Sequence, residues 1–141
     1  TDVAIETADI ALMGEDLHHL PQALDHARRM VADGADIVDV GGESTRPGAR
    51  AVPPAEEQER ILPVIEALLA EDVVLSVDTR HTATARAALA LGPVIVNDVS
   101  GLAHEPDMPA LIAASGAPYL HGAPRPGHPQ AGPAAQTWPP L

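Results

Sequence analysis

Polar side chains stand at the ends of three short apolar runs, and their types are suited to binding a small molecule. The three clusters are Asp39 with residues 41–48 (Gly-Gly-Glu-Ser-Thr-Arg-Pro-Gly), residues 78–80 (Asp-Thr-Arg), and residues 97–101 (Asn-Asp-Val-Ser-Gly). A carboxylate such as Asp78 and a carboxamide such as Asn97 can pair with the N–H groups and ring nitrogens of a heterocycle. Arg46 is a permanent cation that can meet a carboxylate or a diphosphate. These residues favour a site for an anionic heterocyclic ligand.

Each of these residues also has an ordinary structural explanation. An Asp at a strand end, such as Asp78, is often an Asx-turn or helix N-cap residue. The pair Gly41 and Gly42 could form a turn or let the backbone approach a ligand closely. Thr45 could cap a turn, and Arg46 could be a solvated surface cation. Three polar strand ends favour a shared site, because parallel α/β folds bind ligands beyond the carboxyl ends of their strands.

The elements that must position these clusters alternate between short apolar runs and helical patterns. The predicted strands are residues 36–40, 73–77, 94–96 and 118–120. The predicted helices are residues 20–31, 54–70, 82–91 and 107–114. Such alternation predicts right-handed βαβ units and a parallel sheet, which is an α/β fold.

The helix predicted at residues 54–70 has two notable features. It opens with the acids Glu56, Glu57 and Glu59, which complement the helix dipole. Pro63 lies inside it and predicts either a bend or a later start. By contrast, residues 1–15 show no firm hydrophobic period, and no element is predicted there.

Composition narrows the class of protein and of partner. The chain has 141 residues and a formal net charge of −12, which disfavours nucleic acid and anionic membrane surfaces as partners. Tyr119 and Trp138 are its only Phe, Tyr or Trp residues, which largely excludes stacking platforms for single-stranded nucleic acid. It has no cysteine and no long apolar run, which predicts a cytoplasmic protein. A complete (β/α)₈ barrel typically needs about 250 residues, more than this chain has.

The seven histidines do not reveal a metal site by their spacing. His18 and His19 are adjacent, so they would point apart on a helix. The others show no ligand motif; they are His26, His81, His104, His121 and His128. The sequence therefore predicts no metal ligand.

Residues 35–49 (Ala-Asp-Ile-Val-Asp-Val-Gly-Gly-Glu-Ser-Thr-Arg-Pro-Gly-Ala) are similar to the signature of dihydropteroate synthases. Residues 76–79 (Ser-Val-Asp-Thr) and 94–101 (Val-Ile-Val-Asn-Asp-Val-Ser-Gly) follow at that family's spacing. The resemblance covers residues 17–121. It implies a (β/α)₈ barrel, of which this chain would form about the first half. It also implies transfer of a 7,8-dihydropterin-methyl group from its diphosphate to p-aminobenzoate, with magnesium assisting the departure of diphosphate.

The resemblance also implies roles for five residues. Asp78 and Asn97 would hold the pterin ring. Thr45 would lie near the diphosphate. Arg46 would belong to the loop that closes over diphosphate and p-aminobenzoate, so Thr45 and Arg46 are the expected catalytic residues. Asp39 would support the inner rim of the site.

The chain departs from the family pattern at both ends. Residues 1–16 lack the family's first-strand motif, whose Asn binds the metal, and residues 122–141 form a Pro/Gly/Ala-rich segment predicted to be disordered. The later strands would carry a further Asp, a Lys and an Arg, and they have no counterpart here. This pattern predicts a gene fragment or a frameshifted reading frame. A non-catalytic pterin-binding protein is the alternative function, and two half-barrels could associate as a homodimer.

Overall fold

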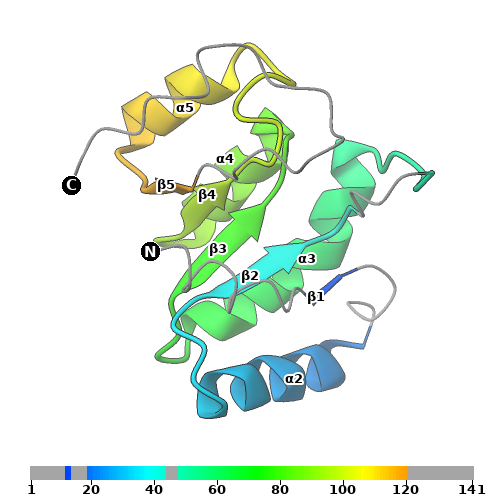
Figure 1. The fold of residues 1–141 in the computed structure, drawn as a ribbon, viewed down its shortest axis with the longest axis vertical. Coiled ribbons are helices and arrows are strands. Elements are labelled where there is room, and N and C mark those ends of the chain that lie inside the picture. The colour runs from blue at the N-terminus through cyan, green and yellow to red at the C-terminus, as the bar shows by residue number, and fades with distance from the viewer. Residues whose placement is uncertain (1–11, 14–18, 44–47, 121–141) are drawn as a thin grey trace.

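The computed structural model describes residues 12–13, 19–43 and 48–120, which form a five-stranded parallel sheet with interspersed helices (Figure 1). In chain order the elements are β1 (Leu12–Met13), α2 (Leu20–Ala32), β2 (Val38–Gly41), α3 (Pro54–Leu69), β3 (Leu75–Asp78), α4 (Thr82–Leu91), β4 (Ile95–Asn97), α5 (Met108–Ser115) and β5 (Tyr119–Leu120). Strand order in the sheet equals chain order, and every neighbouring pair is parallel. None of the helices described is long and apolar enough to span a lipid bilayer.

The core lies between one face of the sheet and the helices. Val38, Val40, Val77 and Val96 are fully buried and alternate with side chains on the opposite face. They join one cluster with buried residues of α2, α3 and α4. Consecutive helices contact one another, α2 with α3, α3 with α4, and α4 with α5. The helices therefore form one layer outside the sheet, and its other face is left for the polar residues.

The three central strands end later than the sequence predicted. β2, β3 and β4 end at Gly41, Asp78 and Asn97, which were expected to follow their strands rather than belong to them. The reason is that ladder pairing continues through these residues, and the N–H of Thr79 still donates to the carbonyl of Asn97 at 3.1 Å. The pleat of the sheet, and not a loop, therefore sets the direction of these side chains.

Two further expectations differ from the structure. α3 begins at Pro54 and continues through Pro63, so the later start suggested by Pro63 is wrong. Pro63 lies on the exposed side of the helix, where water can satisfy the carbonyl of Glu59 that loses its partner. The short strand β1 was not predicted, because two residues carry no period. The predicted tail, residues 122–141, lies outside the described residues.

Candidate functional site

The strand register brings Asp78 and Asn97 side by side. Gly41 pairs with Asp78, and Asp78 pairs with Asn97, in adjacent parallel strands. Residues paired in this way point to the same face of a sheet, here the face opposite the helical layer. Both side chains are partly exposed. A carboxylate and a carboxamide therefore stand next to each other at the carboxyl edge of the sheet, where parallel α/β folds bind ligands.

Asp39 lies one pleat further into the same face and orients Asn97. It is 4% exposed, and its Oδ1 accepts a short hydrogen bond from the Ser76 hydroxyl. The same oxygen accepts a second hydrogen bond, at 3.4 Å, from Nδ2 of Asn97. Because the amide nitrogen faces Asp39, the amide oxygen of Asn97 is left as an acceptor. Asp39 is thus buried and holds the amide of Asn97, and its expected supporting role in a ligand site stays a prediction.

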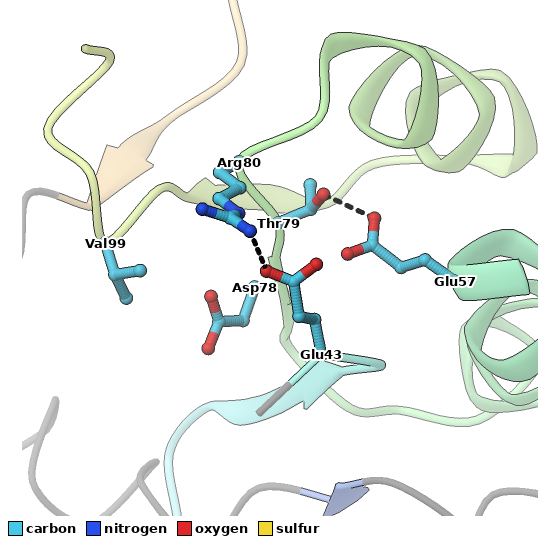
Figure 2. A pocket seen from close by; sticks show the side chains of 6 residues that line it. All are labelled: Glu43, Glu57, Asp78, Thr79, Arg80 and Val99. Atoms are coloured by element: carbon cyan, nitrogen blue, oxygen red, sulfur yellow. Dashed lines mark hydrogen bonds and ion pairs between the residues drawn. The ribbon is translucent and has the colours of Figure 1, made fainter. Parts of the chain in front are cut away.

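The segment that carries Thr45 and Arg46 lies outside the described residues, and Glu43, which precedes it, makes two contacts with other parts of the chain. The backbone N–H of Val52 donates to Oε2 of Glu43 at 3.1 Å. The guanidinium of Arg80 contacts Oε1 of Glu43 at 2.6 Å (Figure 2). One carboxylate therefore links Val52 and the start of the β3–α4 loop to the chain that follows β2. Sequence reasoning did not single out Glu43 or Arg80 for this task.

A small pocket lies between these groups. It is lined by Glu43, Glu57, Asp78, Thr79, Arg80 and Val99 (Figure 2). Its volume is about 10 Å³, which is room for about one water molecule. A bicyclic heterocycle is far larger, so this pocket cannot enclose one.

The two adjacent glycines have different structural reasons. A Cβ on Gly41 would lie 3.2 Å from Cβ of Asp78, so Gly41 keeps space beside the candidate ligand-binding carboxylate. A Cβ on Gly42 would lie 3.0 Å from Cγ2 of Ile61 and 3.2 Å from Cγ of Glu57, both on α3. The absence of a side chain at Gly42 therefore lets α3 pack closely, and the role of the glycine pair in ligand approach stays a prediction.

Glu57 is a fully buried carboxyl group. Its Oε1 accepts a hydrogen bond of 2.6 Å from Thr79 (Figure 2). Oγ1 of Thr79 in turn accepts one from the N–H of His81 at 3.0 Å. Burial raises the pKa of Glu57 more than the contact with Thr79 lowers it. Its spacing of four and eight residues from Ile61 and Ile65 places it on the apolar stripe of α3, which is the signal that sequence reasoning overlooked.

We expect Glu57→Gln to become more stabilising, relative to the wild type, as the pH rises. A carboxyl whose pKa is raised by folding contributes its full stability below its unfolded pKa and loses it as the pH rises through the folded pKa. The introduced glutamine does not titrate and keeps an oxygen for Thr79. The measurement is the free energy of unfolding by urea between pH 4 and pH 8. Glu59→Gln, at an exposed position on the same helix, is the matched control. If the free energies of unfolding of Glu57→Gln and the wild type changed with pH in parallel, this prediction would be contradicted.

A second polar group lies around His81 at the start of α4. Its Nδ1 is 3.2 Å from Oε2 of Glu105, and its Nε2 is 3.4 Å from Oε2 of Glu43. Burial opposes the charged form of His81, but contacts with Glu105, Glu57 and Glu43 together raise its pKa. The backbone N–H of Thr82 donates to Glu105 at 2.7 Å and is the largest cause that lowers the pKa of Glu105 to about 2.

Comparison with known proteins assigns this chain to a family. Residues 7–137 match the family described as pterin binding enzymes. That match spans most of the chain and includes all three polar strand ends. The chain belongs to the family of pterin binding enzymes.

Within that family its relatives are dihydropteroate synthases. The chain is 51% identical over 107 residues to a probable bifunctional folylpolyglutamate synthase/dihydropteroate synthase of Haloferax volcanii, covering 76% of this chain and 13% of that protein. It superimposes with a TM-score of 0.73 and 40% identity on dihydropteroate synthase of Clostridium difficile in the presence of pteroic acid, covering 77% of this chain and 45% of that one. The Xanthomonas albilineans enzyme with 4-aminobenzoic acid gives a TM-score of 0.71, 39% identity, and coverage of 77% and 43%.

These comparisons confirm the predicted fold class and the family resemblance. The chain spans less than half the length of each of these relatives. Its alternating strands and helices are a partial (β/α)₈ barrel. The roles of Asp39, Thr45, Arg46, Asp78 and Asn97 toward a ligand stay predictions.

Proposed function

We propose that this chain carries the pterin-binding part of a dihydropteroate synthase, a transferase of folate biosynthesis. The substrates would be a 7,8-dihydropterin-methyl diphosphate and p-aminobenzoate, and the products dihydropteroate and diphosphate. The observation that carries the proposal is the register of Asp78 with Asn97 on the open face of the sheet. Relatives solved with 4-aminobenzoic acid and with 7,8-dihydropteroate support the same substrate and product.

In the proposed reaction the described residues bind and orient the pterin. Asp78 accepts hydrogen bonds from ring or exocyclic N–H groups, and Asn97 adds an acceptor whose direction is fixed by Asp39. The bond from the pterin methylene carbon to the diphosphate oxygen breaks, the amine nitrogen of p-aminobenzoate bonds to that carbon, and the amine loses a proton. Arg46 and Thr45 would act at the departing diphosphate, where fixed positive charge and hydrogen-bond donors stabilise the developing negative charge.

The described residues do not fit the magnesium ion that this chemistry would use. Magnesium prefers oxygen ligands in octahedral geometry. Among the residues described, each group of three ligand-bearing side chains close enough to share an ion includes the imidazole of His81. Asp39 already has one oxygen bonded to Ser76 and Asn97. We therefore assign no step of the reaction to a metal held by these residues.

A second candidate is pterin binding without turnover. Recognition of a ring would use Asp78 and Asn97, whereas transfer also needs groups that meet p-aminobenzoate and diphosphate. A homodimer would be compatible with either candidate, because β5 pairs on only one side within the described residues. Action on small charged metabolites is compatible with the proposed cytoplasmic location.

The two candidates are separated by one pair of measurements on the purified chain. Isothermal titration with a non-reactive pterin measures recognition, and formation of dihydropteroate from the pterin diphosphate and p-aminobenzoate measures transfer. Binding together with product supports the synthase, and binding without product supports the non-catalytic candidate. Absence of pterin binding by a folded chain contradicts both.

A further inference from the structure

We propose that His81, His104 and Glu105 form a binding site for Zn²⁺, separate from the proposed pterin site. The three side chains can each offer one ligand atom, and these atoms all lie within 4.8 Å of one another. Two imidazoles and a carboxylate are a ligand set that Zn²⁺ accepts, and protein zinc sites with three side chains leave a fourth position for water. The ion would join the loop between β4 and α5 to His81, the residue that precedes α4.

The distances are close to those that a tetrahedral ion imposes. Ligand atoms about 2.0 to 2.2 Å from Zn²⁺ lie about 3.3 to 3.6 Å from one another in a tetrahedron. Nδ1 of His81 and Oε2 of Glu105 are already 3.2 Å apart. The rings of His81 and His104 meet edge to face with centroids 5.4 Å apart. His104 is exposed, so its ring can turn toward the ion without disturbing the core.

The groups behind the ligands are also arranged for a metal. A metal-binding imidazole usually donates a hydrogen bond from its second ring nitrogen to a carboxylate, which fixes the ring orientation. Here Nε2 of His81 lies 3.4 Å from Glu43, which is itself held by Arg80 and by the N–H of Val52. This leaves Nδ1 as the nitrogen for the ion.

Glu105 is oriented in the same manner. Its Oε1 accepts the hydrogen bond of 2.7 Å from the N–H of Thr82, the first residue of α4. Its Oε2 is the atom that faces His81. One oxygen of Glu105 therefore binds the first N–H of the helix, and the other is available to bind the ion.

A second group, formed by Glu43, Glu57 and His81, also satisfies the distance condition. Its carboxylates already have strong partners, because Glu43 contacts Arg80 and Glu57 accepts from Thr79. It is also more deeply buried, with Glu57 inaccessible to solvent. The group of His81, His104 and Glu105 is therefore the better candidate. Sequence spacing could not show it, because His81 and His104 belong to different loops.

The test is direct titration of the tag-free chain, after treatment with a chelator, with ZnCl₂ in a calorimeter. We expect one ion per chain at this site. His104→Ala and Glu105→Gln should each weaken it about tenfold or more, since even groups that only support metal ligands contribute about 10- to 100-fold. Co²⁺ in place of Zn²⁺ should give the visible absorption of a tetrahedral site in the wild type, and His104→Ala should lose it.

His26→Ala is the matched control, because His26 is exposed on α2, away from the proposed site. It should leave zinc affinity unchanged, and His104→Ala should leave the circular dichroism spectrum unchanged. The proposal would be overturned if His26→Ala and His104→Ala lowered the zinc affinity equally, or if the wild type bound no zinc. If Glu57→Gln lowered the zinc affinity and His104→Ala did not, the ligands would instead be Glu43, Glu57 and His81.

Discussion

Asp78→Asn is expected to weaken binding of a pterin to this chain by about 10- to 100-fold, since a hydrogen bond to a charged group contributes about 1.5 to 3 kcal/mol. The substitution keeps the size of the side chain but removes its charge and replaces an acceptor oxygen by a donor NH₂. A donor next to the N–H groups of the ring leaves those groups without a partner. Asn97 offers a single acceptor oxygen, because its amide nitrogen is directed at Asp39, and in the proposed binding mode that oxygen already has its own partner on the ring. Isothermal titration with a non-reactive pterin measures the effect.

Asp72→Asn is the control for this prediction. Asp72 is exposed and precedes β3, whereas Asp78 is the last residue of that strand. The control makes the same chemical change at the opposite end of the same strand. Pterin affinity should not change in Asp72→Asn. If both variants bound pterin as the wild type does, the ligand would not use the carboxyl edge at Asp78 and the site assignment would be wrong.

Ile61→Ala is expected to lower the free energy of unfolding by about 2 to 5 kcal/mol, the usual cost of such a truncation in a core. Ile61 is fully buried and lies where α3 packs on the backbone of Gly42. The substitution leaves a cavity at the junction that supports the end of β2. Urea unfolding monitored by circular dichroism measures the loss. Val74→Ala, at a 54% exposed position, should change it by less than about 0.5 kcal/mol.

The contact with Gly42 can be tested in the same series. Gly42→Ala in the wild type should cost about 1 to 3 kcal/mol, because the added methyl meets Ile61 and Glu57. In the Ile61→Ala background the same methyl enters vacated space and should cost less. Equal costs in the two backgrounds would show that Gly42 is required for another reason.

Much of this architecture was predictable because it depends on local patterns. α4 has the predicted bounds, Thr82–Leu91, since a helix of ten residues carries its own period. β1 escaped prediction, because a two-residue strand is defined only by its partner β2. The strand ends were placed too early, since a polar residue that ends a strand and one that begins a loop have the same local signal. Only ladder hydrogen bonds separate them.

Sequence alone determined the α/β class, the family, and the three polar strand ends at Asp39, Asp78 and Asn97, because these follow from residue order and from motifs. The tertiary structure decided which groups meet. In the structure α3 packs against Gly42, and Glu57 is buried in contact with Thr79. His81 lies next to Glu43 and Glu105. Such contacts join residues from different βα units. Their distances depend on sheet register and helix packing, which no local window of sequence contains.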